Sequence, residues 1–261
     1  MQTPSEQARA KDRDQELALS RGVLYAALSL GFRPPTAETI ERLTDREAVG
    51  ALTEAALRLQ VVSSAAGSDL TRRVRALARA NVALDELAAA YLRLFGHTAR
   101  GEVPAYETEY GAEALFQQPQ ELGDLSGFAE AFGLTLRTDA HERIDHVSCE
   151  CEFASFLAWK EAYALEADDE EMRRATAGAT ALFLRDHLGR FAPVFARRLA
   201  RVDGEGFYAA LGQLLLVLVE TDCRRLGIEL GPETLGLRPD PAACSAPMGC
   251  ETSCGALAEG P

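Results

Sequence analysis

Aromatic and acidic side chains recur together in short fragments of this chain, and their chemistry is that of binding. Tyr91 and Phe95 stand one helical turn apart, while Tyr106 and Tyr110 flank Glu107. Tyrosine rings combine a large apolar contact area with a hydroxyl that can hydrogen-bond, so together these rings could line a groove for an apolar peptide. Helical spacing alone favours core packing for Tyr91 and Phe95.

Further acids and the histidines follow along the chain. Glu142, Asp145 and His146 share one fragment, and His187 stands in another. A carboxylate matches the planar fork of a guanidinium, so a ligand with two arginines would need more than one acid, and Glu107 and Glu142 could add to Asp145. By residue type alone, both glutamates are ordinary surface residues. By residue type and position alone, Asp145 is an acid at the start of a helix, where the helix dipole stabilises a negative charge.

No catalytic constellation accompanies these residues. The sequence contains no phosphate-cradling glycine loop, no nucleophile elbow and no evident pairing of a cysteine with a histidine. His141, Glu142 and His146 resemble a zinc-protease motif, but the second histidine comes one position too late for both imidazoles to share a helix face. The sequence therefore predicts that the protein is not an enzyme.

Cysteines near the C-terminus form an alternative site. Cys244, Cys250 and Cys254 lie in a segment that contains glycine and proline and could let them converge on zinc or an iron–sulfur cluster. Their spacing matches no standard site, and a fourth ligand is not evident. The thiols could equally be inert or redox-active. No other cofactor is predicted.

Helical periodicity determines how these residues are positioned. Apolar residues recur every three to four positions along almost the whole chain, and no stretch alternates as a half-buried strand does. The pattern predicts an all-α, single-domain helical bundle over residues 17–230, with a polar extension at 1–16 and a flexible Cys/Pro/Gly-rich tail at 231–261. The expected helices span residues 17–31, a short segment capped by Thr36, 48–62, 69–95, 119–133, 142–167, 168–187, 190–202 and 207–226.

Charge and hydropathy exclude several functions. The formal net charge is -13, which repels nucleic-acid phosphates and favours basic partners. The most apolar run, residues 211–219, is too short to cross a bilayer, so no membrane span is predicted. Residues 1–16 are polar and lack the apolar core of an export signal, which predicts a cytoplasmic protein.

The order of the fragments resembles that of one known family. The fragments are Tyr91-Leu92-Arg93-Leu94-Phe95, Pro104-Ala105-Tyr106-Glu107-Thr108-Glu109-Tyr110, Glu142-Arg143-Ile144-Asp145-His146 and Asp186-His187-Leu188-Gly189-Arg190-Phe191. Over residues 17–230 they resemble the TorD/DmsD/NarJ family of redox enzyme maturation chaperones, which bind the twin-arginine leaders of molybdoenzymes. The resemblance implies a TorD-like helical bundle that is a monomer or a swapped homodimer.

The resemblance also implies roles for individual residues. It places Tyr106, Glu107 and Tyr110 on a surface that faces the ligand. It further implies that Asp145 accepts hydrogen bonds from leader arginines while His146 orients that carboxylate.

Other positions of the resemblance are less close. His187 matches a His-Leu fragment and is expected to join two helices; a position in the peptide-binding pocket is the alternative. Ile144 stands where the family often has proline, which weakens the match of the turn, and Phe191 stands where tryptophan is frequent.

The implied function is that of a system-specific chaperone. It would bind the leader of an apo-molybdoenzyme catalytic subunit and keep that subunit competent for cofactor insertion, export or assembly. Molybdenum-cofactor biosynthesis proteins are further candidate partners. A metal- or redox-responsive protein that uses the C-terminal cysteines is the alternative. A hydrolase that uses Asp145 and His146 is weaker, because no serine or water-activating partner is evident.

Overall fold

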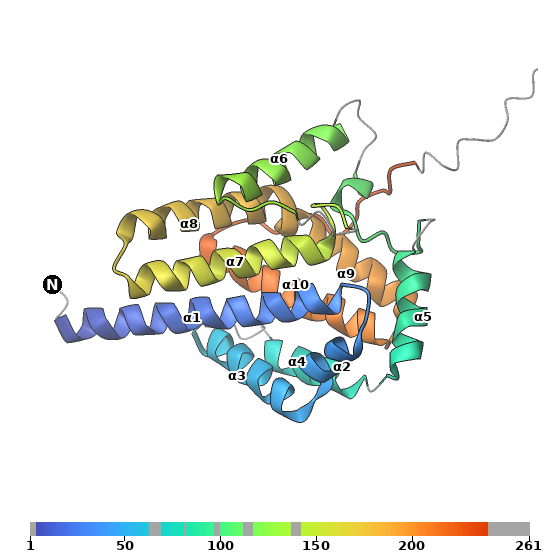
Figure 1. The fold of residues 1–261 in the computed structure, drawn as a ribbon, viewed down its shortest axis with the longest axis horizontal. Helices are drawn as coiled ribbons and strands as arrows, with labels where there is room; N and C mark the ends of the chain where they lie inside the picture. Colours follow the sequence, from blue (N-terminus) through green and yellow to red (C-terminus); the bar gives the residue numbers. More distant parts are fainter. Residues whose placement is uncertain are drawn as a thin grey trace, which may run out of the picture.

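A computed structural model describes residues 4–62, 69–80, 82–96, 100–111, 117–136 and 142–239. Within these ranges the regular secondary structure is helical, and β-structure is limited to isolated bridges in the loops (Figure 1). This confirms the predicted all-α fold. The helices are α1 (Pro4–Gly31), α2 (Ala37–Thr44), α3 (Arg46–Val62), α4 (Leu70–Arg79), α5 (Leu84–Phe95), α6 (Gln117–Ala131), α7 (Val147–Glu166), α8 (Glu170–Phe183), α9 (Gly189–Asp203) and α10 (Phe207–Leu226), with short turns η1 (Glu107–Glu109) and η2 (Leu184–Leu188).

The centre of the bundle is the antiparallel pair of α1 and α7. Leu24 and Leu28 of α1 and Leu157 of α7 are fully buried, as the apolar face of each helix predicts. Helices α3 and α4 cover one side of this pair and α8 the other, while α9 and α10 pack together and α5 stands across one end (Figure 1). The bundle therefore presents helix ends and loops at the end where α5 lies.

A buried ionic cluster joins three helices. The guanidinium of Arg21 in α1 lies 2.7 Å from Glu161 of α7 and 3.7 Å from Asp222 of α10. The hydroxyl of Tyr25 donates a 3.0 Å hydrogen bond to the same aspartate. Because a buried charge is costly unless it is paired, this cluster restricts how α1, α7 and α10 can pack.

Several helix boundaries differ from those that periodicity predicts. The polar extension is helical from Pro4, so α1 begins well before residue 17. The expected helix over 69–95 is two helices, because α4 ends at Arg79 and Ala83 is extended before α5. Helix α4 packs against α3 and α10 whereas α5 packs against α9, and one straight helix could not bury both faces. By contrast, α10 has the predicted bounds.

The expected break at Gly189 is absent, because the chain stays helical from α8 through the π-helical turn η2 into α9. A Cβ atom at Gly189 would overlap the carbonyl oxygen of Leu184 and lie 3.0 Å from the sulfur of Cys223. The widened turn and the packing of α9 against α10 therefore require glycine at this position.

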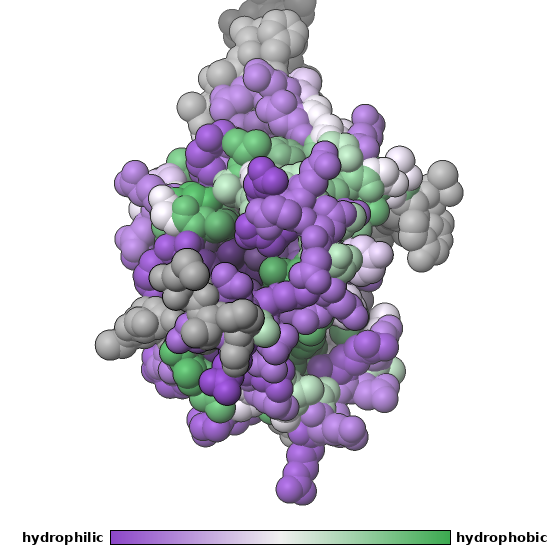
Figure 2. Space-filling view, turned by 90° about the vertical axis from the view of Figure 1, so that its left-hand side faces the viewer, coloured by the Kyte–Doolittle hydropathy of each residue, from purple (hydrophilic) through white to green (hydrophobic). Residues whose placement is uncertain are grey.

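No helix within the described ranges is both long enough and apolar enough to cross a membrane. The end of the molecule from which α1 projects is mainly hydrophilic, and its apolar residues form small separate groups (Figure 2).

The close approach at Gly189 predicts opposite effects for two glycine substitutions. Gly189→Ala should lower the free energy of unfolding by about 1–3 kcal/mol, because a methyl group has no room there. Gly178→Ala should raise it by about 0.5–1 kcal/mol, because Gly178 is an exposed helical residue with open space around it. Urea unfolding followed by circular dichroism measures both, and equal effects of the two substitutions would contradict the packing described.

Candidate functional site

Two segments that are distant in sequence pair at the α5 end of the bundle. The amide of Val147 donates to the carbonyl of Ala105 at 2.8 Å, and the amide of Glu107 donates to the carbonyl of Asp145 at 2.9 Å. Tyr106 and His146 face each other in this bridge, with ring centroids 5.0 Å apart. The pairing brings together two fragments that the sequence marks as candidate binding residues.

This pairing also determines where α7 begins. Residues 142–146 are held in a turn beside residues 105–107 and cannot join the helix that periodicity predicts from residue 142. His146 is instead the N-cap of α7, because its Nδ1 accepts a 3.2 Å hydrogen bond from the amide of Ser148. Neither Asp145 nor His146 therefore lies in the first turn of α7.

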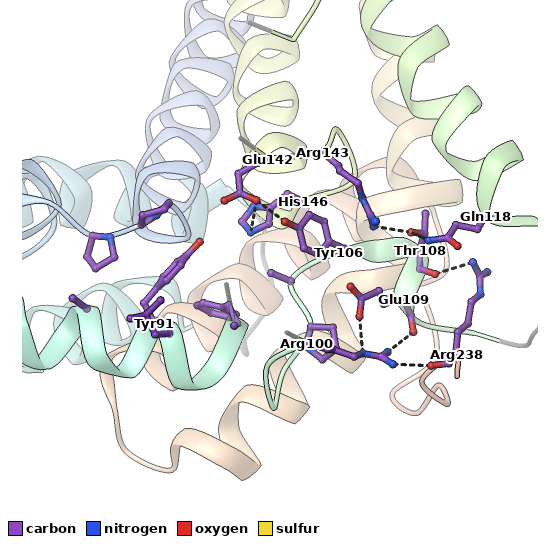
Figure 3. A pocket seen from close by; sticks show the side chains of 18 of the residues that line it. Tyr91, Arg100, Tyr106, Thr108, Glu109, Gln118, Glu142, Arg143, His146 and Arg238 are labelled. Atoms are coloured by element: carbon purple, nitrogen blue, oxygen red, sulfur yellow. Dashed lines mark hydrogen bonds and ion pairs between the residues drawn. The ribbon is translucent and has the colours of Figure 1, made fainter. Parts of the chain in front are cut away.

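A pocket of about 890 Å³, here called the main pocket, opens between α5 and the paired segments (Figure 3). Its walls include five residues that the sequence predicts as binding residues, namely Tyr91, Phe95, Tyr106, Glu142 and His146. Further lining residues were not predicted and include Pro34, Leu92, Arg100, Thr108, Arg143 and Arg238. Thr108 and Arg143 belong to the predicted fragments, but no local pattern marks their side chains as part of a wall.

The other predicted residues lie behind the wall of the main pocket. Glu107 is buried and accepts from Nδ1 of His187 at 3.0 Å, and Arg190 approaches its other oxygen at 3.5 Å. The hydroxyl of Tyr110 donates to the carbonyl of Pro104 at 2.8 Å. These contacts support the loop that carries Tyr106, and a binding role for Glu107, Tyr110 and His187 stays a prediction.

Asp145 is also buried behind the wall, with 0% of the residue exposed. Its carboxylate accepts from Nε and Nη2 of Arg143 at 3.0 and 2.8 Å and from the hydroxyl of Thr108 at 2.7 Å. The ring nitrogens of His146 face other partners, since Nδ1 lies 2.7 Å from the hydroxyl of Ser148 and Nε2 lies 3.9 Å from Glu142, and an orienting role of His146 toward Asp145 stays a prediction. Asp145 therefore already has an arginine partner within the chain.

Glu142, like Glu109, carries a carboxylate that lines the main pocket. It accepts a 2.6 Å hydrogen bond from the hydroxyl of Tyr106 and lies 3.9 Å from Nε2 of His146 (Figure 3). Burial lowers the pKa of His146 to about 4, so this imidazole is uncharged at neutral pH. Among the described residues no lysine or arginine pairs with Glu142, whose side chain is 24% exposed. Its negative charge is thus available to a ligand.

The C-terminal segment completes the opposite wall. The amide of Arg238 donates to the carbonyl of Glu109 at 2.9 Å, and its guanidinium lies 3.1 Å from Glu121 of α6. Arg100 is also held by an ion pair, with its Nε 2.6 Å from the carboxylate of Glu109. Residues 231–239 therefore pack against the bundle, which their composition alone did not indicate.

A second, more apolar cavity of about 590 Å³ adjoins the main pocket, and Pro34 and Glu142 line both. The apolar cavity lies between α6, α7 and α8. Its wall includes Leu125, Ala129, Leu134, Leu136, Phe153, Phe156 and Phe183.

The candidate metal ligands Cys244, Cys250 and Cys254 lie outside the described residues. Within the described part of the chain, no group of three or more histidine, cysteine, aspartate and glutamate side chains could hold a metal ion. A metal or redox function of the C-terminal cysteines stays a prediction.

The buried imidazole of His146 predicts a pH-dependent stability. Burial lowers its pKa to about 4, while Glu142 and Asp145 oppose this shift and Arg143 and Arg33 add to it. In the unfolded chain His146 has its ordinary pKa of 6.5 and takes up a proton below that pH. In the folded protein the same imidazole takes up a proton only when the pH falls to about 4. The free energy of unfolding should therefore decrease as pH falls through this range, by about 2 kcal/mol between pH 7 and pH 5.

The matched variant is His146→Asn, because an asparagine oxygen can still cap α7 but does not titrate. Urea unfolding at pH 7 and pH 5 should show that the native protein loses about 2 kcal/mol more than the variant. Parallel losses in both proteins would show that His146 is not held uncharged by burial.

Comparisons with known proteins identify the family of the chain. A family described as nitrate reductase delta subunit matches residues 46–197. The TorD chaperone of Photobacterium profundum is 30% identical over 137 residues, which cover 52% of this chain and 62% of that protein. The TorD chaperone of Escherichia coli O7:K1 is 34% identical over 161 residues, covering 61% of this chain and 73% of that protein. A selenate reductase assembly chaperone of Thauera selenatis is 38% identical over 108 residues, covering 41% and 53%.

The aligned part spans less than two thirds of the Photobacterium and Thauera proteins but more than two thirds of the Escherichia coli protein. The family match covers more than half of this chain. The chain belongs to the TorD/DmsD/NarJ family of redox enzyme maturation chaperones.

Proposed function

We propose that the protein is a cytoplasmic chaperone that binds the N-terminal leader of an immature molybdoenzyme catalytic subunit in the main pocket. Membership of the chaperone family supports this function, as does the similarity to a protein named as an assembly chaperone for selenate reductase. Binding holds the apoenzyme until its cofactor is inserted and delays its export or assembly. No chemical step is needed, because the chaperone releases the partner unchanged.

The observation that carries this proposal is the carboxylate of Glu142 on the wall of the main pocket. It has no cationic partner among the described residues, and it lies beside the rings of Tyr106 and His146. A leader guanidinium can form a charge-assisted pair with this carboxylate and stack against the neighbouring rings. The formal net charge of -13 also attracts a basic leader at long range.

The apolar cavity suits the remainder of such a leader. A twin-arginine leader continues from its arginines into an apolar stretch, and the two cavities adjoin at Pro34 and Glu142. The apolar stretch would place its side chains against Phe153, Phe156 and Phe183, in the manner of an amphipathic helix in a groove. One continuous peptide can thus occupy both cavities.

Replacement of Glu142 tests this arrangement. We expect Glu142→Gln to weaken binding of a synthetic twin-arginine leader about tenfold or more in calorimetry, because the isosteric amide removes the charge that pairs with a guanidinium. The matched control is Glu54→Gln, which changes an exposed glutamate on α3 that pairs with Arg58. This control should leave the affinity unchanged.

The peptide itself supplies the complementary test. A leader whose two arginines are replaced by glutamine should bind the native protein weakly. Its affinities for the native protein and for Glu142→Gln should be equal. The assignment of Glu142 fails if the charge-free variant binds the original leader as tightly as the native protein does. Asp145 is a poorer target, because alanine there would also leave the Arg143 guanidinium without its partner.

A further inference from the structure

One arginine of the chain is held as a ligand arginine would be held. The guanidinium of Arg143 grips the carboxylate of Asp145 with two hydrogen bonds, of 3.0 Å from Nε and 2.8 Å from Nη2. Its central carbon lies 4.4 Å from the centre of the Tyr106 ring. A two-pronged contact with a carboxylate combined with stacking on an aromatic ring is the arrangement by which proteins recognise arginine.

The exposure of the two partners is unequal. Asp145 is 0% exposed, whereas 45% of the Arg143 side chain is exposed toward the main pocket. No group in the pocket can reach this carboxylate while Arg143 covers it. Because the outer side of Arg143 faces open space, its side chain can rotate away from Asp145 into the main pocket without a change in the packing of the helices.

The other arginines of the wall lack this freedom. The side chain of Arg100 is 17% exposed, and it donates to the backbone carbonyls of Arg238 and Glu109 on two sides. The side chain of Arg238 is 10% exposed and donates to the carbonyl of Thr108 as well as to Glu121. Within the described part of the chain, the hydrogen bonds of the Arg143 guanidinium go instead to Asp145 and Thr108, which lie beneath it.

We propose that Arg143 is an internal competitor, which occupies the arginine site over Tyr106 and Asp145 in the empty chaperone and is displaced by an arginine of the bound leader. This inference rests on the proposed function, since it assigns the second leader arginine to Asp145 while Glu142 holds the first. The exchange replaces one guanidinium with another, so the buried carboxylate has a cationic partner both in the empty chaperone and in the complex.

The exchange has two consequences for recognition. A leader with glutamine at this position would have to displace Arg143 and leave a buried charge without a partner, so the site discriminates strongly in favour of arginine. The observed affinity is also lower than the intrinsic affinity, because only the fraction of molecules with Arg143 swung away can bind fully. Removal of the competitor should therefore strengthen binding.

The test is calorimetry of Arg143→Ala with a synthetic twin-arginine leader. We expect this variant to bind the leader about tenfold more tightly than the native protein. The gain should vanish for a leader whose two arginines are replaced by glutamine. Methylguanidinium should compete with the leader in Arg143→Ala, because it can occupy the vacated position, whereas methylammonium should not.

Two further variants complete the test. Arg143→Lys keeps a cation beside Asp145 and serves if the alanine variant does not fold; it should bind the leader several times more tightly than the native protein, because an ammonium cannot grip both oxygens. The control is Arg173→Ala, which removes an exposed arginine with the same two-pronged contact, to Glu170 on α8. It should leave the affinity unchanged.

The outcomes separate this inference from the proposed function. If the native protein binds the leader and Glu142→Gln weakens binding, the proposed function stands. In that case, leader binding that is unchanged or weaker in both Arg143 variants overturns the competitor role alone. The competitor role is also overturned if Arg143→Ala binds the glutamine leader more tightly than the native protein does. If the native protein does not bind a twin-arginine leader at all, both proposals fail.

Discussion

Two backbone hydrogen bonds hold the candidate site together, one between Glu107 and Asp145 and the other between Val147 and Ala105. They join a loop after α5 to the turn before α7, which are far apart in the sequence. Tyr106 is thereby placed against His146 and within hydrogen-bonding distance of Glu142. The same pairing buries Asp145, so that its charge must be neutralised from within the chain. The shape and the charge of the main pocket both follow from this local pairing.

A layer of buried and half-buried charges supports the paired segments from behind. Glu107 contacts His187 and Arg190, and Arg190 also donates to Glu121 at 2.9 Å. Glu121 in turn binds Arg238, so the layer connects η1, η2, α6, α9 and the C-terminal segment. Such networks add little net stability, but breaking one partner is costly, and the network therefore favours a single arrangement of the pocket wall. The network thereby supports the loop that carries Tyr106, whose hydroxyl donates to Glu142.

Periodicity alone was sufficient for the parts of the fold in which one helix buries one continuous face. Helix α10 has the predicted bounds because its apolar residues and the flanking glycines agree. The break between α4 and α5 could not be predicted, because it depends on which helices each half packs against. The start of α7 at Val147 depends in the same way on a pairing with residues distant in sequence. Local patterns record burial, but they do not record such non-local partners.

The same limit applies to the site. The fragments that resemble the chaperone family predicted that Tyr106, Glu142 and His146 would lie together, and the structure places all three on the main pocket. The sequence did not indicate that Asp145 is covered by Arg143, because neither residue type nor spacing reveals an internal ion pair. Residues 231–239 were assigned to a tail on composition, although Arg238 reaches Glu121. Both arrangements depend on tertiary contacts that local patterns do not record.

The central claim is that the main pocket receives a leader arginine at Glu142, and a crystal structure of the chaperone with a synthetic twin-arginine leader tests it most directly. The account predicts one guanidinium within hydrogen-bonding distance of the Glu142 carboxylate and the following apolar residues against Phe153 and Phe156. A leader bound on another face of the bundle, with the main pocket empty, would contradict it.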